Sequence, residues 1–417
     1  MSMKINERGR AKHRPLRDYD PKIVKELLLN KIEEEQKTIQ KLAYEETKPI
    51  VQYKDDKINV LSLFSGAGGL DLGVELAGLA AVIGREKAQK AFHDRENYRA
   101  VRNESIFHTI YTNDLFKEAN ETYQLNFPPT FQHEMDIRKI KEFPSADLVL
   151  GGFPCPGFSE AGPRLIDDER NFLYIHFIRC LLQAKPFAFI AENVKGMLTL
   201  GKGEVMNQIM QDFTSAGYNV KFKLVNARDY GVPQHRERVF IIGIRNDIEF
   251  NYKFPEPTHG HGKDLEPFIT LKNAIGDLEN NPGDWYKGGF SPIYLSRNRK
   301  KKWDEQSFTI QASGRQAPLH PSGPEMVKVD KDHWILPDDP SLHRRLSVSE
   351  ISRIQTFPDW FIFSDGGNLE SSKNNRLNKQ YKQIGNAVPV NLAKEIAMPI
   401  AKWSKENMES IKQLVLF

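Results

Sequence analysis

The strongest candidate for a reactive side chain is Cys155, which stands between two prolines in the segment GGFPCPGFS, residues 151–159. Proline fixes its own backbone and restricts the residue before it, so the thiol is held in one direction. Lone cysteines are most often buried in a core, but this glycine- and proline-rich setting does not suit a packed core. We therefore interpret Cys155 as a nucleophile. Cys180 lies in the helical apolar stripe FIRCL and is interpreted as structural.

Charged residues stand beside two other apolar runs. Glu192 follows the run Phe187–Ala191, where a carboxylate costs desolvation unless it has a partner, so it is a candidate for acid–base work. Arg236 and Arg238, in the segment QHRER, precede the run Val239–Ile244. Because residues i and i+2 of an extended segment share a face, we expect both arginines to point the same way. Taken singly, each of these three residues is more often an ordinary salt-bridge residue.

A glycine-rich turn, FSGAGGL at residues 64–70, follows the first apolar run and opens a helix. Glycines there let the backbone approach a ligand, and the helix N-terminus offers free N–H groups. The spacing is not GxGxxG, which argues against a dehydrogenase. Asp114, at the end of the next strand, could hold ribose hydroxyls. Asp136, after a third short strand, could reach a purine.

Short apolar runs alternate with helical patterns from residue 58 onward. The strand candidates are Ile58–Phe64, Phe107–Thr112, Asp147–Leu150, Phe187–Ala191, Val220–Val225 and Val239–Ile244, and the helical patterns include Asn171–Ala184 and Val205–Ala216. This alternation predicts an α/β fold with a doubly wound, mostly parallel sheet, and ligands bind at the carboxyl edge of such a sheet. The charged stretch Arg85–Ile106 interrupts the alternation and is interpreted as an insertion.

Changes in composition and in the periodicity of apolar residues divide the chain into four parts. We predict an N-terminal extension at 1–57, an α/β domain at 58–250, a small loop-rich domain at 251–343, and a segment at 344–417 that returns to the α/β domain with helices at Ser347–Gln355 and Pro389–Trp403. The extension has six basic residues in Met1–Arg17 against one acidic residue, and a helix is expected from Asp20 and Pro21. A surface helix behind a solvated tail is favoured over an arm that binds DNA phosphates.

Composition narrows the class of protein without deciding it. The 417 residues include 59 Lys and Arg against 55 Asp and Glu. The resulting net charge of +4 neither indicates nor excludes a nucleic-acid partner. Two cysteines are too few to staple the fold and favour a reducing, cytoplasmic setting. The chain shows neither a signal-peptide pattern nor an apolar run of membrane-spanning length, so we expect no membrane association.

Five motifs, FSGAGGL, GGFPCPGFS, ENVKG, QHRER and QIGNAVP, occur in one order and spacing that resembles the DNA (cytosine-5) methyltransferase family. The resemblance implies a Rossmann-like catalytic domain that binds S-adenosylmethionine, without a metal. The residues it assigns to the cofactor are Phe64, Ser65, Gly66, Gly68, Gly69, Leu70, Asp114, Asp136, Ile137, Pro154, Leu173, Asn386 and Ala387. The family often has an aromatic residue directly after the ribose carboxylate, where this chain has Leu115.

The same resemblance implies a covalent mechanism on a flipped-out cytosine. Cys155 would attack carbon 6, so that carbon 5 becomes nucleophilic toward the methyl group. Glu192 would hydrogen-bond N3 and the exocyclic amine, with Arg238 orienting the site and Arg236 in support. Ser159 would contact a phosphate. The family usually has Gln after the cysteine, whereas this chain has Pro156.

The loop-rich domain corresponds to the target-recognition domain of that family. It contains RNRKKK at residues 297–302, and FTIQASGRQ at 308–316 is expected to form a strand and a glycine turn. This region resembles modification methylases that protect GGCC sites, which implies that Arg297, Arg299 and Arg315 contact guanine in the major groove of double-stranded DNA. The inner cytosine of GGCC is then the expected target. Alternatively, Lys300–Lys302 only bind phosphate and position the protein.

The implied setting is a restriction-modification system in the bacterial cytoplasm. We expect a monomer whose cognate restriction endonuclease acts on the same site without a stable complex. Two other functions stay open at this point. One is a tRNA cytosine-5 methyltransferase on the same scaffold, which a shorter recognition domain would favour. The other is a DNA-binding regulator that uses the N-terminal arm, although both the nucleophile and the carboxylate of an enzyme are present.

Overall fold

The computed structural model describes residues 49–154, 172–337 and 339–414, together with residues 26, 29, 30, 32–35 and 37. The described residues between 26 and 37 are helical, as expected for the extension. The basic arm, Cys155 and Ser159 lie outside the described residues. Among the described residues, no helix combines the length and apolar character needed to cross a bilayer.

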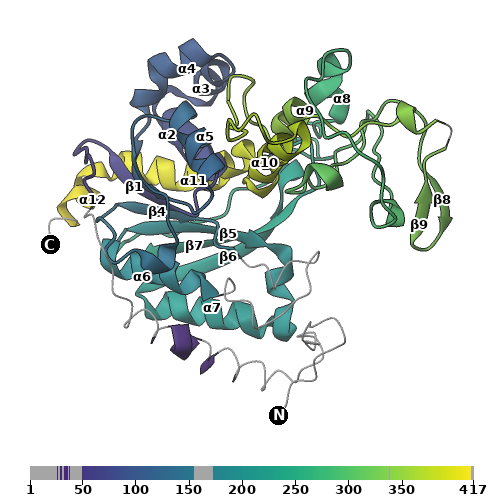
Figure 1. The fold of residues 1–417 in the computed structure, drawn as a ribbon. Coiled ribbons are helices and arrows are strands. Elements are labelled where there is room, and N and C mark those ends of the chain that lie inside the picture. The colour runs from purple at the N-terminus through teal and green to yellow at the C-terminus, as the bar shows by residue number, and fades with distance from the viewer. Residues whose placement is uncertain are drawn as a thin grey trace.

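A seven-stranded sheet forms the centre of the molecule (Figure 1). Its strands are β1 (Ile58–Leu63), β2 (Phe107–Asn113), β3 (Phe131–His133), β4 (Leu148–Gly151), β5 (Ala188–Val194), β6 (Tyr218–Asn226) and β7 (Glu237–Arg245). The spatial order is β3-β2-β1-β4-β5-β7-β6, and β7 runs antiparallel to the other six strands. The predicted doubly wound, mostly parallel sheet is therefore confirmed, with all six strand candidates close to their expected positions.

Helices cover both faces of this sheet, as Figure 1 shows. They are α2 (Gly69–Ile83), α5 (Lys117–Asn126), α6 (Tyr174–Ala184), α7 (Glu204–Ser215), α10 (Lys373–Asn386), α11 (Val390–Glu406) and α12 (Met408–Leu414). Strand β1 is buried throughout and alternates between two cores, with Ile58 and Val60 in one and Leu61 and Leu63 in the other. The first core contains residues of α2 and α11, and the second contains residues of α6 and α7.

The C-terminal segment returns to the sheet through the contact of α11 with α2. A Cβ atom on Gly73 of α2 would lie 2.4 Å from the Cβ of Ala393 in α11, so the two helix backbones approach each other closely at this point. Larger side chains at either position would force the helices apart. The early and late parts of the sequence thus share one core, in line with the predicted return at residues 344–417.

The charged stretch after α2 is an ordered two-helix insertion. It contains α3 (Arg85–Phe92), α4 (Arg95–Val101) and the 3₁₀ turn η2 (Arg102–Glu104). Gly84, with a φ of 92°, separates α3 from α2, so the helices are not continuous. Arg85 pairs with Glu395 of α11 at 2.7 Å, and Arg102 pairs with Glu75 of α2 at 2.9 Å. These ion pairs fix the insertion at both ends.

The recognition region extends to one side of the sheet and contains little regular structure (Figure 1). Its elements are α8 (Leu271–Ile275), η9 (Gly276–Leu278), η10 (Tyr294–Ser296), η11 (Gly314–Gln316), the hairpin β8 (Val327–Asp330) and β9 (His333–Ile335), and η12 (Pro340–Leu342). Tyr252 is 1% exposed in the main core and its hydroxyl donates to the Ile396 carbonyl. These contacts favour a domain boundary a few residues later than 250.

The strand predicted at the start of residues 308–316 is wrong. The backbone of Ile310 bonds to side chains instead of a neighbouring strand, because its N–H donates to Gln234 Oε1 at 2.9 Å and its carbonyl accepts from Arg236 Nη1 at 3.3 Å. The chain next packs against Gly385, where a Cβ would lie 2.4 Å from the carbonyl carbon of Gln311. Side chains and a close backbone contact therefore replace the ladder, and η11 forms at the expected glycine turn.

The helix expected at Ser347–Gln355 is confirmed as α9 (Val348–Ile354), whereas no helix was predicted where α10 lies. Helix α9 begins at a capping box, in which Ser347 Oγ accepts from the Glu350 N–H and the Glu350 side chain accepts from the Ser347 N–H. The other short turns are η3 (Ile137–Lys139), η6 (Lys195–Leu198), η7 (Leu200–Gly203) and η8 (Ala227–Tyr230). Helix α9 joins the recognition region to α10 and so to the sheet.

Candidate active site

The carboxyl ends of the parallel strands form the edge at which the predicted site residues meet. Leu63, at the end of β1, is in register with Asn113 of β2 and with Gly151 of β4. Gly151 is in turn paired with Ala191 of β5, directly before Glu192. Side chains and loops that follow these strands therefore share one edge, where open α/β sheets bind their ligands.

The turn after β1 shapes a small open surface. Phe64 has a φ of 53°, which few non-glycine residues adopt, and Gly66 has the same φ. A Cβ on Gly66 would meet nothing within 4 Å, whereas one on Gly68 would collide with the Phe127 ring at 2.5 Å. The backbone at Gly66 is thus open to a ligand, while Gly68 is needed for packing.

Asp114 is fixed beside this turn by backbone N–H groups. Its Oδ2 accepts from Gly66 at 2.8 Å and its Oδ1 accepts from Phe116 at 2.7 Å. Burial raises the pKa of Asp114, although these hydrogen bonds and the charge of Lys382 oppose the shift. Each carboxylate oxygen keeps acceptor capacity beyond its backbone bond, so the group is suited to hydroxyl donors.

Asp136 lies at the end of the neighbouring strand β3. Asn113 joins the two strand ends, because its Nδ2 donates to the His133 carbonyl at 2.7 Å and to the Met135 carbonyl at 2.8 Å. Burial opposes ionisation of Asp136, but the hydrogen bonds and charge of Arg138 outweigh it and lower the pKa. Ile137 follows as a buried residue.

The segment QIGNAVP packs directly against the glycine turn. A Cβ on Gly69 would lie 2.5 Å from the Val388 carbonyl oxygen and 3.1 Å from the Cβ of Ala387. Asn386 ends α10 and is exposed, while Ala387 is 9% exposed. The structure thus brings two predicted cofactor motifs together. The other two predicted pocket residues, Pro154 and Leu173, are half-buried at either side of residues 155–171, which are outside the described part of the chain.

Glu192 and Arg238 form a buried ion pair on adjacent strands. Arg238 Nε lies 2.8 Å from Glu192 Oε1, and the two side chains are 14% and 11% exposed. The antiparallel register of β5 and β7 pairs Arg238 with Val194, two residues beyond Glu192 on the same face. Burial lowers the pKa of Arg238, and the charge and hydrogen bond of Glu192 oppose this shift. The pair provides a carboxylate whose orientation is fixed.

This carboxylate faces the segment that leads to Cys155. A Cβ on Gly152 would lie 3.3 Å from Glu192 Oε2. Asn193 Nδ2 donates to the Phe153 carbonyl at 3.0 Å, which fixes the same segment one residue further on. Cys155 itself is outside the described residues, as is Ser159. Cys180 is fully buried in α6, and burial raises its pKa, so its structural interpretation is confirmed.

Arg236 lies close enough to the ion pair for the charges of Arg238 and Glu192 to act on its pKa, which burial lowers, but its hydrogen bonds go elsewhere. It is 1% exposed and donates to the carbonyls of Ile310, Gly385 and Ala387. No described carboxylate bonds to Arg236. It is therefore a positioning residue that connects the recognition region with the segment QIGNAVP.

Sequence reasoning missed a buried amide pair that extends this connection. Gln234 Nε2 donates to Gln355 Oε1 at 2.7 Å, and Gln355 Nε2 donates to the carbonyls of Ile384 and Ala387. Gln234 lies in the motif QHRER, which was noted for its charges, whereas Gln355 ends α9 without any local signal. It also missed Lys382, whose Nζ lies 4.0 Å from the centre of the Phe116 ring beside Asp114.

The three arginines predicted to contact guanine have different surroundings. Arg297 and Arg315 are exposed, and neither side chain has an ion pair or hydrogen bond with another described residue. Arg299 is 5% exposed, and it donates from Nε to the Tyr294 carbonyl at 3.0 Å and from Nη2 to Gln316 Oε1 at 2.8 Å. This arrangement weighs against Arg299 as a free reader of bases, because those bonds hold it inside the domain.

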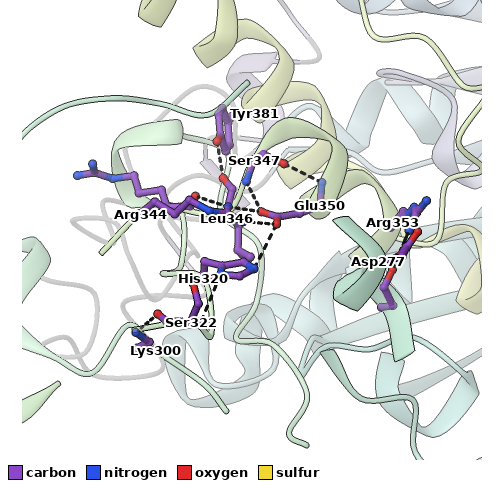
Figure 2. Close-up of polar contacts among 12 residues, drawn as sticks. Asp277, Lys300, His320, Ser322, Arg344, Leu346, Ser347, Glu350, Arg353 and Tyr381 are labelled. Carbon is purple, nitrogen blue, oxygen red and sulfur yellow. Dashed lines mark hydrogen bonds and ion pairs between the residues drawn. The ribbon is translucent and has the colours of Figure 1, made fainter. Parts of the chain in front are cut away.

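The neighbouring lysines are also engaged. Lys300 Nζ donates to the carbonyls of Ser322 (Figure 2) and Pro324, and burial lowers its pKa to about 8. Lys301 pairs with Glu305 at 2.7 Å, and Lys302 pairs with Glu325 at 2.8 Å. The alternative in which these three lysines only bind phosphate therefore loses support, since each has a partner within the domain.

Comparison with known proteins now defines the class of the chain. The family model for C-5 cytosine-specific DNA methylases matches residues 58–402. The chain therefore belongs to this family, and it is a DNA (cytosine-5) methyltransferase.

Two relatives match almost the whole chain. The type II methyltransferase M.BsuRI of Bacillus subtilis is 64% identical, over 98% of this chain and 94% of its own. The type II methyltransferase M.BspRI of Lysinibacillus sphaericus is 62% identical, over 98% of this chain and 97% of its own.

Solved structures confirm the fold at lower sequence identity. The Entamoeba histolytica methyltransferase EhMeth has a TM-score of 0.58 at 18% identity, covering 84% of this chain and 98% of that one. An E. coli structure described as a putative DNA modification methyltransferase encoded within a prophage has a TM-score of 0.56 at 22% identity, covering 82% and 98%. At these identities the likeness shows the fold alone.

Proposed function

We propose that the enzyme transfers a methyl group from S-adenosylmethionine to carbon 5 of a flipped-out cytosine through a covalent adduct with Cys155. The observation that carries this proposal is the Glu192–Arg238 pair, at 2.8 Å, facing Gly152. The carboxylate of Glu192 is thus oriented toward Gly152, which stands three residues before the proposed nucleophile, at the ligand-binding edge of the sheet. Because carbon 6 is inaccessible in a duplex, the cytosine must leave the stack to reach this edge.

The described residues suit the proposed cofactor. Asp114 presents carboxylate oxygens beside the open backbone of Gly66, which fits ribose hydroxyls, and the half-buried Phe116 ring with Lys382 above it lies two residues further on. Asp136 and Ile137 lie one strand further along the same edge, where the adenine would be held. When bound, S-adenosylmethionine supplies an electrophilic methyl group. The protein's part is to fix its orientation toward the base.

Four events at the base follow from the side chains. The Cys155 thiolate adds to carbon 6, the Glu192 carboxyl shares a proton with N3 as negative charge develops on the ring, and its other oxygen accepts from the exocyclic amine. Carbon 5 would then form its bond to the methyl carbon as the bond from that carbon to the cofactor sulfur breaks. Loss of the proton from carbon 5 expels the cysteine sulfur and restores the aromatic ring. Arg238 holds Glu192 in place throughout, and Ser159 would contact a phosphate of the flipped nucleotide.

We propose double-stranded GGCC as the target, with methylation of the inner cytosine. Support comes from the resemblance of residues 296–321 to GGCC-specific methylases and from the free, exposed side chains of Arg297 and Arg315. Arginine reads guanine through O6 and N7 in the major groove. Arg299 would join them only if its bonds to Tyr294 and Gln316 opened.

The proposed setting is a type II restriction-modification system, since both relatives described above are named type II methyltransferases. The enzyme would then act as a cytoplasmic monomer and protect host DNA from a cognate restriction endonuclease, without a stable complex between the two.

Bisulfite sequencing of plasmid DNA treated with the enzyme and S-adenosylmethionine tests the target. We expect conversion-resistant cytosines only at the inner position of GGCC, together with resistance to a nuclease that cuts GGCC. Methylation confined to another sequence would refute the target, and methylation of tRNA in preference to duplex DNA would refute the substrate. Cys155→Ala should abolish transfer while DNA binding persists, and Cys180→Ala is the matched control that should retain transfer.

A further inference from the structure

Arg345, just before α9, is almost completely buried among aromatic rings. It is 2% exposed, and its guanidinium carbon lies 4.5 Å from the centre of the Phe290 ring, 5.0 Å from that of Tyr294 and 5.5 Å from that of Tyr286. Such rings attract a cation through their faces. This cage orients the guanidinium but supplies no negative charge.

The hydrogen bonds of Arg345 go to backbone carbonyls. Its Nε donates to the Arg315 carbonyl at 3.2 Å, its Nη1 donates to Gly288 at 2.8 Å, and its Nη2 donates to Gly289 at 2.9 Å. Arg315 carries one of the two exposed guanidiniums of the recognition region. The buried arginine therefore holds the backbone from which the exposed one extends.

No carboxylate in the described part of the chain contacts Arg345, whereas its neighbours have acidic partners. Arg344 binds both oxygens of Glu350, and Arg353 binds Asp277 (Figure 2) and Asp359. Burial lowers the pKa of Arg345. Leaving a buried cation without an acid costs stability; the carbonyls and rings offset part of that cost but leave the positive charge unneutralised.

The turn that carries Arg315 is held from two further directions. The Gly314 N–H donates to Asn378 Oδ1 of α10 at 2.9 Å, and a Cβ on Gly314 would lie 2.8 Å from side-chain atoms of both Tyr286 and Tyr381. On the other side, Arg299 binds the Gln316 side chain at 2.8 Å. Arg345 binds the Arg315 carbonyl between them. The three consecutive residues of η11 are therefore each fixed to a different part of the chain.

The backbone next to Arg345 is also held by hydrogen bonds. Tyr381 donates its hydroxyl to the Leu346 carbonyl, and Ser347 caps α9 through Glu350, as Figure 2 shows. The residues on both sides of Arg345 are thus fixed to α9 and α10. Movement of Arg345 relative to the turn would break bonds at both ends.

We propose that Arg345 is a positioning residue for sequence recognition, which aims Arg315 at the DNA through its backbone and adds uncompensated positive charge beneath the reading surface. This inference rests on the proposed function, because it assumes that Arg315 contacts a base. An anionic duplex would supply the counter-charge that the protein lacks. The two contributions, geometry and charge, are separable by substitution.

The test compares Arg345→Lys, which keeps the charge but replaces the three nitrogens of the planar guanidinium by one ammonium group, with Arg345→Gln, which loses the charge as well. For each full-length variant, Kd and KM are measured for a GGCC duplex and for duplexes with one guanine replaced, alongside Kd for S-adenosylmethionine, kcat and the thermal midpoint. Arg353→Lys is the matched control, because it alters an arginine of the same segment that has acidic partners away from the turn.

Arg345→Lys is expected to lower the ratio of cognate to substituted binding about tenfold, a typical size for one well-oriented base contact, with the cofactor Kd and kcat unchanged. Arg345→Gln should show the same loss together with weaker binding to every duplex and a smaller salt dependence. Unchanged discrimination in folded Arg345→Lys overturns the geometric part, and an unchanged salt dependence in Arg345→Gln overturns the electrostatic part. A parallel loss of cofactor binding would show a merely structural role. If the wild-type enzyme does not methylate GGCC, the proposed function fails first, independently of these variants.

Discussion

The catalytic edge and the recognition region both bury arginines, but they compensate the charge differently. At the edge, Arg238 is 2.8 Å from Glu192, so a buried cation meets a buried anion. In the recognition region, Arg345 and Arg299 contact an aromatic ring instead of an acid. The centre of the Tyr294 ring lies 5.0 Å from the guanidinium of Arg345 and 4.7 Å from that of Arg299. No described carboxylate contacts either of them.

The difference matches what we propose that each region binds. A neutral base at the proposed catalytic edge needs an oriented carboxyl group, and Arg238 holds Glu192 in place. A polyanion at the recognition region is attracted by positive charge that acidic side chains have not already neutralised. A net charge of +4 for the whole chain conceals this division.

Removing the carboxylate from the catalytic pair should have the largest effect. Glu192→Gln keeps the size of the side chain but cannot give a proton to N3 as negative charge develops on the ring, so we expect kcat to fall about 100- to 1000-fold. Binding of duplex DNA should change little. Steady-state transfer of labelled methyl groups and DNA binding by anisotropy measure the two quantities.

Glu237→Gln is the control for that substitution, because Glu237 forms a half-exposed pair with Lys195 and not with an arginine of the site. It should leave kcat within about twofold, as expected for a surface pair. Near-normal turnover of Glu192→Gln would show that the buried pair has no role in catalysis.

Asp71, at the start of α2, is a buried acid that has no basic partner among the described residues. It allows a test of a buried acidic group that no arginine or lysine compensates. Ser62 and Tyr123 each donate a hydroxyl to it at 3.1 Å, and burial raises its pKa to about 6. A raised pKa means that its contribution to stability is present below pH 4 and is lost as the pH rises through 6. Relative to wild type, Asp71→Asn should gain up to about 3 kcal/mol of unfolding free energy between pH 4 and pH 8.

Urea unfolding at intervals across that range measures the difference. The exposed residue Asp56 provides a control, since Asp56→Asn should follow the wild-type curve. Parallel curves for Asp71→Asn and wild type would show that Asp71 stays charged in the folded protein throughout this range.

Arg315→Ala examines the reading surface directly. Loss of one bidentate contact should cost about 1–3 kcal/mol of binding at its guanine and relax specificity at that position only. Competition binding with duplexes substituted at single base pairs measures this. Arg297→Ala should relax a different position, and a uniform loss across all duplexes in either variant would assign that arginine to phosphate instead.

The smallest effect is expected for Lys302→Ala, because Lys302 is exposed and paired with Glu325 at 2.8 Å. The affinity for DNA should change less than about twofold, and the slope of log Kd against log salt should stay the same. A slope reduced by about one would restore Lys302 as a phosphate contact.

Local patterns were sufficient to predict the strands, the glycine turn and the carboxylate at the sheet edge. Alternation of buried residues in β1 and the apolar runs before Glu192 and Arg238 are properties of adjacent residues. That Glu192 and Arg238 touch is a different matter, since it depends on β7 entering antiparallel beside β5. No pattern within either segment specifies its neighbour in the sheet.

The recognition region was less predictable because distant side chains replace its regular hydrogen bonds. Ile310 was expected in a strand, yet its backbone bonds to Gln234 and Arg236. The run 297–302 was predicted to contact DNA, yet Arg299 and Lys300 are buried against backbone carbonyls. Charged residues inside a domain are exceptions to the general preference for the surface, and their partners are set by the tertiary fold.

The close contact between Gly73 of α2 and Ala393 of α11 has a consequence for biosynthesis. The face of α2 that Ala393 covers emerges from the ribosome early, and its cover emerges near the end of translation. At about 5 to 20 residues per second, this interval lasts on the order of tens of seconds. Throughout it the nascent chain exposes apolar surface and lacks Val388 beside the glycine turn. We therefore expect chains that end before α11 to leave this face of α2 uncovered and to lack methyltransferase activity.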